Sequence, residues 1–485
     1  METSAKIPHP WLNSLITFLV IAGLFAFCYV GHFSLIIPVL FLILSIHLFL
    51  TKKASRRFLL QLGLLVAILW AGSYYALLNG PDVAKYYIPV ATIPMLTILF
   101  FNDLQVGFLL AFVSSTLVGL LAKNDFDLAL ISFVGSLVGM YAIRDARNRG
   151  QLINAGFYTG LVQVVCSLLL NWESLLYLPR EKFFLVQFFS NDIQPFFLNG
   201  FIAVFIVMNT SKVFEWLFGV LTNFSLIELS DFNHPLLRRM ILEAPGTYHH
   251  SLLVSNLAEA AAEAIGANAL LARVGAYYHD IGKMLKPEYF TENQLHSGNK
   301  HDHLEPSMSR LVILNHVKEG VELGRRYKLN PIILDFIPQH HGTGLIHYFY
   351  QKALEERQEG EEIQQENFRY PGPKPQTKEA ALIMLADSVE GATRALDEPT
   401  PLKIGEVVRK IINNRFIDGQ LDECNLTLKD IEKISSTFIR VLSAMHHARV
   451  KYPEKKDDHD NHHRQPAEEN LAKSRPNPAP RKKNP

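Results

Sequence analysis

Long stretches without charge constrain the fold of this chain more than any other feature. Apart from histidine, no charged residue occurs between Lys6 and Lys52, between Arg57 and Asp82, between Lys85 and Asp103, or between Arg149 and Glu173. A membrane-spanning helix needs about 20 mostly apolar residues, so the first gap has room for two spans and each of the others for one. Helices of a large soluble core would carry charged faces instead. The sequence therefore predicts a polytopic transmembrane domain over residues 1–216.

We expect eight spans in this domain: 11–31, 34–51, 58–78, 86–102, 104–122, 126–143, 152–171 and 194–216. The basic loops at 52–57 and 144–149 indicate the cytoplasmic side, and the amino terminus and the chain after the last span fall on that side too. The loop at 173–192 then lies on the opposite side. The first apolar stretch is too long, and its flank too weakly basic, for a cleaved signal peptide.

The second half of the chain carries histidines and aspartates in a pattern typical of a metal centre. Two adjacent pairs, His279-Asp280 and His340-His341, accompany the single residues His250, His316 and Asp387. Imidazole nitrogens and carboxylate oxygens are ligands for Fe, Mn, Zn and Ni, and one carboxylate can bridge two cations. Asp280 is the candidate bridge. Such a site supplies a hydroxide nucleophile near neutral pH, which suits hydrolysis of a phosphoester.

No single helix presents all these groups to one point, so the site must be assembled by tertiary folding. On a helix His279 and Asp280 diverge by about 100°, which would let each face a different ion, and the same reasoning applies to His340 and His341. His316 and Asp387 lie in apolar runs of helical spacing. We therefore expect an all-α chain, in which a helical membrane domain is followed by an all-helical cytoplasmic domain at 248–452.

Neighbouring histidines and the cysteines do not join this ligand set. His249 points elsewhere on a helix, and five histidines lie at or beyond the last helix: His446, His447, His459, His462 and His463. The three cysteines, Cys28, Cys166 and Cys424, are far apart and predict neither a disulfide framework nor a thiolate zinc site. A centre of nitrogen and oxygen ligands favours two divalent ions, Fe or Mn, over structural zinc.

Several motifs together resemble a known family. They are Pro245-Gly-Thr-Tyr-His-His-Ser-Leu, Tyr278-His-Asp-Ile-Gly-Lys-Met, Pro287-Glu-Tyr-Phe-Thr-Glu-Asn-Gln, Phe368-Arg-Tyr-Pro-Gly-Pro-Lys-Pro and Leu385-Ala-Asp-Ser-Val-Glu-Gly-Ala. In this order they resemble the bacterial seven-transmembrane HD-hydrolase proteins of the PgpH type, over residues 229–452 and more loosely over the membrane domain. The resemblance implies a phosphodiesterase of the bacterial inner membrane, with its HD domain in the cytoplasm, that opens cyclic di-AMP to pApA at a di-iron or di-manganese centre.

The resemblance also implies roles for individual residues. One metal would be held by His250, His279, Asp280 and Asp387, and the other by Asp280, His316, His340 and His341. Lys283 would place an ammonium near the scissile phosphate and stabilise the charge on its oxygens. Arg394 is a second phosphate-contact candidate, with a structural salt bridge as the alternative.

The chain departs from the family pattern near its amino terminus. Related proteins carry a large extracytoplasmic domain after the first span, whereas here about residues 31–34 separate the first two expected spans. A signal would then enter through the membrane domain itself, through the 173–192 loop, or through a signalling partner in the membrane. The alternative partner is a second copy of the chain, in a homo-oligomer. The connecting helical segment at 217–247 is the expected coupling element to the HD domain.

Two further segments are expected to be irregular. Residues 355–378 are charged and proline-rich, and predict a surface excursion that acts either as a binding loop, through Arg369, Tyr370 and Lys374, or as a mobile solvated loop. Residues 453–485 predict a disordered tail.

Other functions remain open on the sequence alone. A related site could hydrolyse cyclic di-GMP, but the Gly-Tyr-Pro signature of such HD proteins is missing, since Gly342-Thr-Gly follows His341. The sequence is also compatible with hydrolysis of a guanosine alarmone, and with a receptor that binds a nucleotide without turnover. No DNA-reading helix stands out, so we expect no nucleic acid polymer as a partner.

Overall fold

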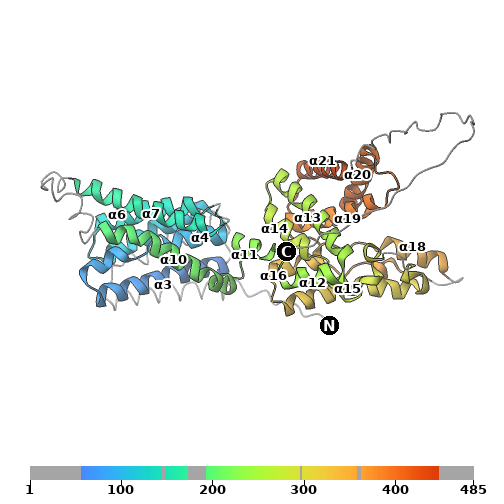
Figure 1. Ribbon diagram of the computed structural model, residues 1–485, viewed down its shortest axis with the longest axis horizontal. Coiled ribbons are helices and arrows are strands. Elements are labelled where there is room, and N and C mark those ends of the chain that lie inside the picture. The colour runs from blue at the N-terminus through green and yellow to red at the C-terminus, as the bar shows by residue number, and fades with distance from the viewer. Residues whose placement is uncertain are drawn as a thin grey trace, which may run out of the picture.

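The computed structural model of the chain describes residues 56–144, 146, 148–172, 193–294, 298–357 and 362–446. Within these ranges the secondary structure is helical and contains no β-strand, as the sequence predicts. The apolar helices gather in one lobe and the histidine-bearing helices in another, with the short helix α11 (Asn223–Leu229) between them (Figure 1). Two expected spans, 11–31 and 34–51, as well as the 173–192 loop and the 453–485 tail, lie outside the described residues.

Six helical segments of the described chain are long and apolar enough to cross a membrane. They comprise α3 (Arg56–Asn79), η1 (Asp82–Tyr87) with α4 (Thr92–Phe101), α5 (Leu104–Leu121), α6 (Phe126–Ile143), α7 (Arg149–Leu170) and α10 (Ile193–Phe218). They match the last six of the eight expected spans. Charge-free length therefore located these long apolar helices correctly wherever the structure describes them.

The fourth span differs from the expectation of one continuous helix over 86–102. The chain forms the 3₁₀ helix η1, becomes extended at Ile88, and begins α4 only at Thr92. Pro89 lies in this break and cannot donate a backbone hydrogen bond. The side chain of Asn199, on α10, donates to the carbonyls of Tyr86 (3.0 Å) and Ile88 (2.7 Å). An interrupted helix is tolerated at membrane depth because a neighbouring helix satisfies the freed carbonyls.

Glycines allow α7 and α10 to pack with their backbones in contact. A Cβ atom added to Gly200 would lie 2.2 Å from the carbonyl oxygen of Gly156 and 2.5 Å from the nitrogen of Gly160. Small residues at such an interface are typical of helix packing in membranes, where close van der Waals contact replaces the hydrophobic effect. These two helices therefore form a closely packed pair in the membrane lobe.

The connecting segment is bonded to both lobes. At its start, the buried carboxylate of Glu215 accepts hydrogen bonds from the hydroxyls of Thr222 and Ser225. Further on, Leu226 of α11 belongs to the apolar core of the HD lobe, and the carbonyl of Leu229 accepts a hydrogen bond from the hydroxyl of Tyr278 at 2.8 Å. The segment then continues into α12 (Pro235–Glu243), which begins with a proline at its first position.

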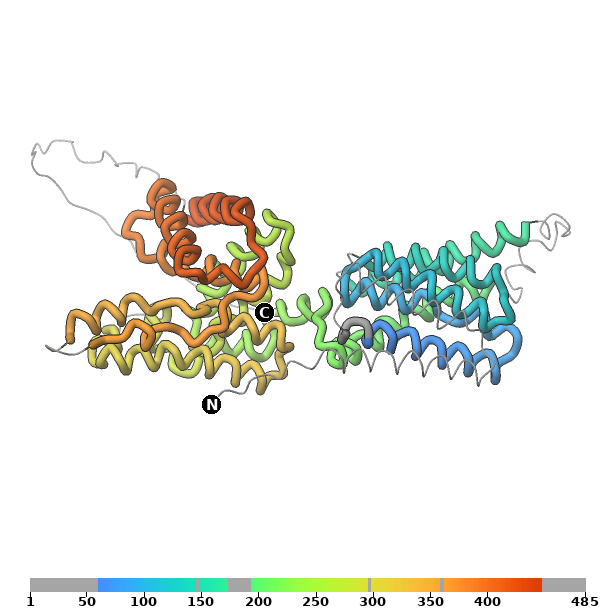
Figure 2. The backbone as a smooth tube through the Cα atoms, turned by 180° about the vertical axis from the view of Figure 1, so that it is seen from behind, coloured from blue at the N-terminus to red at the C-terminus, as the bar shows by residue number. Residues whose placement is uncertain are grey.

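The helices of the HD lobe surround a core of buried aliphatic side chains. They are α13 (Pro245–Ile265), α14 (Ala269–Tyr278), η3 (Ile281–Leu285), α15 (Pro306–Arg326), α16 (Pro331–Leu334), α17 (Phe336–Gln339), α18 (His347–Glu356), α19 (Lys378–Arg394), α20 (Pro401–Ile417) and α21 (Leu428–Met445), with short 3₁₀ turns η4 (Pro287–Tyr289), η5 (Thr291–Asn293), η6 (Lys300–His303) and η7 (Gln365–Phe368). Helices α13 and α19 pack against each other, and α20 and α21, orange to red at the upper edge of the lobe in Figure 2, pack against this pair.

The described part of the 355–378 excursion is attached to the domain and is not a solvated loop. Leu345 and Arg369 form an isolated antiparallel bridge, and the backbone nitrogen of Tyr370 donates to the carbonyl of Gly344 at 3.0 Å. The guanidinium of Arg369 also pairs with Asp418 at 2.9 Å. These long-range contacts hold residues 362–377 against the lobe, so the mobile-loop interpretation was wrong for them.

Candidate metal centre

Three helices and two helix ends bring the seven predicted ligand residues together. His250 lies on α13, His316 on α15 and Asp387 on α19. The expectation that the two adjacent pairs lie within helices was wrong. Helix α14 ends at Tyr278 and α17 at Gln339, so each pair begins at the residue that closes a helix. Leaving the helix lets neighbouring side chains turn toward one cavity more freely than the fixed 100° step allows.

The seven residues form two groups that share Asp280. One group is His250, His279, Asp280 and Asp387, and the other is Asp280, His316, His340 and His341; in each, the potential ligand atoms lie within 4.8 Å of one another. Oδ2 of Asp280 lies 3.2 Å from Nε2 of His279 and 3.6 Å from Nε2 of His250. Oδ1 of Asp280 lies 3.5 Å from Nε2 of His316 and 3.6 Å from Nε2 of His340. Each oxygen of this carboxylate therefore faces its own group of histidines.

Backbone carbonyls orient three of the imidazoles. Nδ1 of His279 lies 2.7 Å from the carbonyl of Ala276, Nδ1 of His340 lies 3.2 Å from that of Phe336, and Nδ1 of His316 contacts its own helix in the same way. With the proton on Nδ1, the lone pair of each Nε2 points into the site, which is the usual arrangement of a metal-binding histidine.

The inward-facing atoms have no other role in the described structure. Nε2 of His279, His316, His340 and His341, and Oδ1 of Asp280, are buried and have no hydrogen-bond partner among the described residues. Leaving one buried polar atom unpaired costs about 1–3 kcal/mol, and five in one cavity would be a large cost without a ligand. Divalent cations fit this set, because all five atoms are electron-pair donors.

The pKa values of these residues agree with a role as electron-pair donors to a metal ion. Burial alone would raise the pKa of Asp280, but the facing His279 and Lys283 outweigh it and hold that pKa well below its usual value. Burial lowers the pKa of His340 to about 3 and that of His341 well below its usual range. The carboxylate is therefore ionised and these imidazoles are neutral at physiological pH, as metal binding requires.

His250 is held by two carboxylates. Its Nδ1 lies 2.5 Å from Oε2 of Glu390, and its Nε2 lies 3.0 Å from Oδ1 of Asp387. Burial by itself lowers the pKa of His250, but these two contacts raise it to about 10. A cation bound at Nε2 would displace that proton, while Glu390 would keep the ring orientation. The predicted phosphate contact Arg394 lies at the outer edge of this network, 3.6 Å from the other oxygen of Glu390.

Lys283 lies inside the site and is fully paired. Its Nζ is 2.6 Å from Oδ2 of Asp280 and 3.0 Å from Oε1 of Glu292, and it lies over the ring of Phe290. Burial by itself lowers the pKa of Lys283, but the two carboxylates raise it above its usual value, so the ammonium is charged. Its side chain is 13% exposed, so it is not a solvated lysine at a helix end.

Two close contacts fix the positions of ligand residues. The ring of Tyr370 stacks on that of His341, with 4.1 Å between centroids and 21° between planes. A Cβ atom added to Gly282 would lie 1.8 Å from the carbonyl oxygen of His316. The turn after Asp280 therefore packs directly on the backbone of α15.

Sequence reasoning missed Glu390 and Glu292 and did not foresee the position of Tyr370. Glu390 had a detectable signal, because it follows Asp387 by three residues and shares its helix face. Glu292 had none, since a short 3₁₀ turn brings it to Lys283 by tertiary contact.

Family models match both lobes. The model for the 7TM receptor with intracellular HD hydrolase matches residues 77–222, and the HD domain model matches residues 247–392. The second match contains all seven ligand candidates and ends just before Arg394.

Curated relatives extend over both lobes. The cyclic-di-AMP phosphodiesterase PgpH of Listeria monocytogenes is 41% identical over 77% of this chain and 51% of its own length, and that of Bacillus subtilis is 38% identical over 76% and 51%. The chain thus spans about half the length of these relatives. A crystal structure of the L. monocytogenes PgpH HD domain in complex with cyclic-di-AMP is 50% identical, with a TM-score of 0.43, and covers 44% of this chain and 100% of that one. The chain belongs to the PgpH-type family of seven-transmembrane proteins with an intracellular HD domain.

Proposed function

We propose that the chain is a membrane-anchored phosphodiesterase that hydrolyses cyclic di-AMP to pApA at a dinuclear metal centre. The observation that carries the proposal is the placement of Asp280, whose two oxygens face two separate groups of histidines. The names of the two PgpH relatives support the choice of cyclic di-AMP as substrate. The apolar spans support anchoring in a bilayer, which for a bacterial chain is the inner membrane, with the HD lobe in the cytoplasm.

The residues of the site have distinct roles in this proposal. His250, His279 and Asp387 hold one cation with Asp280, and His316, His340 and His341 hold the other. Two divalent cations, Fe or Mn, would lower the pKa of water toward about 7 and offset the charge of the phosphodiester. The lowered pKa values of Asp280 and His340 support this role, because they keep the carboxylate ionised and the imidazole neutral, which are the forms that bind a cation.

Lys283 supplies fixed positive charge beside the shared carboxylate. Its ammonium lies 2.6 Å from Asp280, so a phosphate placed between the two groups of ligands would meet it. In a buried site such a charge stabilises the equatorial oxygens of an in-line displacement without reorganisation. Arg394, with 44% of its side chain exposed, is our second candidate for a phosphate contact.

The test is turnover by the purified full chain in lipid nanodiscs, loaded with Mn²⁺ or Fe²⁺ and given cyclic di-AMP or cyclic di-GMP. We expect metal-dependent formation of pApA, resolved by chromatography, with little action on cyclic di-GMP. Two bound metals per chain without hydrolysis of either would support a receptor or another nucleotide substrate.

Substitutions separate the two halves of the centre. Asp280→Ala should abolish activity and the loading of both ions, whereas His316→Ala should mainly empty one site. The matched control is His249→Ala, because His249 is the exposed neighbour of His250 on the same helix. Near-normal hydrolysis in the Asp280 or His316 variant would overturn the ligand assignment.

A further inference from the structure

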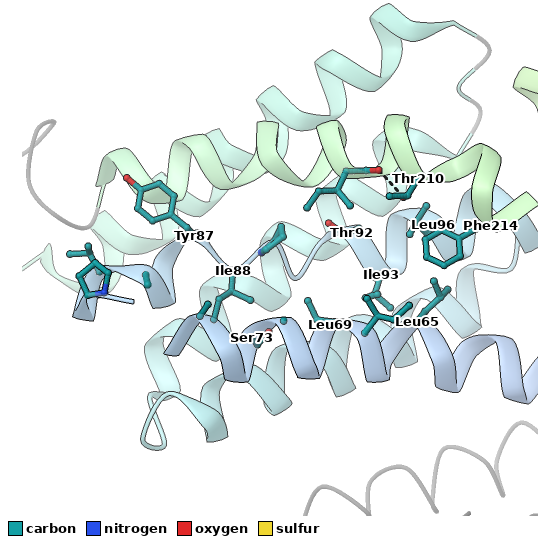
Figure 3. A pocket seen from close by; sticks show the side chains of 18 residues that line it. Leu65, Leu69, Ser73, Tyr87, Ile88, Thr92, Ile93, Leu96, Thr210 and Phe214 are labelled. Atoms are coloured by element: carbon teal, nitrogen blue, oxygen red, sulfur yellow. Dashed lines mark hydrogen bonds between the residues drawn. The ribbon is translucent and has the colours of Figure 1, made fainter. Parts of the chain in front are cut away.

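A cavity of about 560 Å³ lies in the membrane lobe, far in sequence from the metal centre. The interrupted fourth span forms its floor, and α3 and α10 form its two walls (Figure 3). Its volume is within the range of small-molecule binding sites, which is about 300–1,000 Å³. The residues that line it are Leu65, Ile68, Leu69, Gly72, Ser73 and Ala76 on α3; Pro81, Val83, Ala84, Tyr87, Ile88, Pro89, Thr92, Ile93 and Leu96 on the floor; and Ile206, Thr210 and Phe214 on α10.

Two lining hydroxyls have no partner. Ser73 is 2% exposed and Thr92 is 5% exposed, yet Oγ of Ser73 and Oγ1 of Thr92 make no hydrogen bond within the described structure. A hydroxyl in a membrane helix usually bonds to the carbonyl four residues earlier, as Thr97 and Thr210 do here. Since no water competes in a bilayer core, an unpaired hydroxyl that lines a cavity indicates a missing partner.

The break in the fourth span explains why Thr92 is free. Thr92 is the first residue of α4, so its side chain follows the extended stretch and has no preceding helical turn to bond to. Ser114 and Ser136 are also buried and unpaired, but they line no part of this cavity. Ser73 and Thr92 therefore differ from them in having space for a ligand.

The chemistry of the walls selects the class of ligand. No Asp, Glu, Lys or Arg is among the lining residues, so a charged head group would be buried without a counterion. Between Ser73 and Leu65 the wall formed by α3 extends over eight residues, about 12 Å of helix, and its side chains there are aliphatic. Ile68, 51% exposed, lies at the rim on a face that a bilayer would cover. The two hydroxyls thus lie between the end of the cavity at Tyr87 and the apolar end at Leu65 and Phe214 (Figure 3), and the rim at Ile68 would face the lipid phase.

We propose that this cavity binds a neutral single-chain amphiphile, whose hydroxyl or carbonyl head bonds to Ser73 and Thr92 and whose tail lies along Leu69 and Leu65. The site is separate from the phosphodiesterase proposal, because binding here requires neither metal nor turnover. Nothing in the lining would hold a phosphate or a nucleotide.

Photolabelling of the full chain in nanodiscs tests the site. The probe is a long-chain alcohol with a diazirine in its tail, and the comparison probes are the same chain ending in a methyl group or in a carboxylate. We expect the alcohol to label α3 and α10 peptides roughly fivefold more than either comparison probe, since each hydrogen bond is worth about a factor of three to ten in affinity.

Glycines on α3 provide a filled-cavity variant and its control. Gly72 lines the cavity and Gly63 does not, and a Cβ atom added at either position meets nothing within 4 Å. Gly72→Phe should therefore fill the cavity and abolish labelling, while Gly63→Phe should leave it unchanged.

A second pair of variants tests the head group. The double variant Ser73→Ala with Thr92→Val should remove the preference for the alcohol over the methyl-terminated probe, whereas Ser136→Ala should preserve it. Equal labelling of Gly72→Phe and the unaltered chain, or no preference for the alcohol, would overturn the proposal. Cross-links confined to residues 1–55 would also overturn it, since a segment of the chain itself would then be the probe's contact.

Discussion

Nδ1 of His250 lies 2.5 Å from Oε2 of Glu390, and this contact directs Nε2 of the same ring toward Asp387. The ion pairs of the Glu390 carboxylate in the described structure are with His250 and Arg394, so it acts as a positioning residue for one half of the centre. We expect Glu390→Ala to weaken metal binding about 10- to 100-fold, the usual cost of losing the partner of a metal-binding histidine. Titration of metal per chain measures this directly.

Graded substitutions separate orientation from folding in that prediction. Glu390→Gln retains an oxygen that can accept the Nδ1 proton, so its affinity should fall between those of the unaltered chain and Glu390→Ala. Arg394→Gln removes only the outer ion pair and should bind metal normally. Unchanged metal affinity in Glu390→Ala would contradict the positioning role.

Lys283 should be required for turnover more than for metal binding. Lys283→Ala removes the charge beside Asp280 but no ligand atom, so turnover should fall while metal content stays near that of the unaltered chain. The change also leaves Glu292 buried without its cation, which should lower the free energy of unfolding by about 3–5 kcal/mol.

The next lysine along the chain, Lys286, is the control for this change. Lys286 is exposed, so Lys286→Ala should alter neither activity nor stability. Loss of metal from Lys283→Ala in a quantitative metal analysis would show that Lys283 is structural.

Lowering the pH should weaken the attachment of residues 362–377 to the lobe, because it protonates Asp418, the ion-pair partner of Arg369. Partial burial alone raises the pKa of Asp418, but its hydrogen bonds to Arg369 and Gln420 outweigh it and lower that pKa below its usual value of 3.8. A lowered pKa in the folded state means that the ion pair stabilises the protein above about pH 4 and loses its effect as the pH falls through the native value. The contribution is below about 1 kcal/mol, because both groups are partly exposed.

Hydrogen exchange can resolve this local effect. At pH 5 the Asp418→Asn variant should exchange faster than the unaltered chain within 362–377, and the difference should shrink as the pH falls through the lowered pKa of Asp418. Asp422→Asn, which removes a longer and more exposed contact with Lys374, should have no effect. A difference between the two exchange rates that does not shrink as the pH falls would refute the mechanism.

Asn199 should stabilise the membrane lobe through the interrupted span. Asn199→Leu leaves the carbonyls of Tyr86 and Ile88 without their donor, at a cost of about 1–3 kcal/mol for a buried unpaired group. Thermal unfolding in detergent should therefore shift to lower temperature. Asn209→Leu on the same helix is the control, because Asn209 is exposed and bonds only to its own helix; equal shifts in both variants would count against the role of Asn199.

The sequence predicted helices correctly where the local pattern of one segment determines them. It did not predict features that depend on contacts between distant segments. The six described spans follow from local apolar length, and the helices that carry His316 and Asp387 follow from local spacing. Pro89 is a local signal for the break before α4, but Asn199, which satisfies the freed carbonyls, comes from a distant helix that no local pattern reveals.

The same limit applies to the metal centre. The ligand candidates were found because their chemistry is distinctive, and the structure brings all seven together. The assignment of His279-Asp280 and His340-His341 to helix interiors failed because each helix stops where its side chains must diverge; Gly342, with φ +55°, turns the chain immediately after the second pair. Glu292 reaches Lys283 only in the folded chain.

Gly282 has no functional group, yet the site depends on it as a spacer. The turn that carries Asp280 lies against α15 with no room for a methyl group, so the backbone at position 282 sets the gap between that turn and His316. A Cβ atom there would lie 1.8 Å from the carbonyl oxygen of His316, whereas ordinary contact begins at 3.4 Å, so any side chain would force the turn and α15 apart. The absence of a side chain at position 282 therefore sets the distance between Asp280 and His316. A single added carbon there would change the geometry of both metal sites, which share Asp280, without altering any ligand.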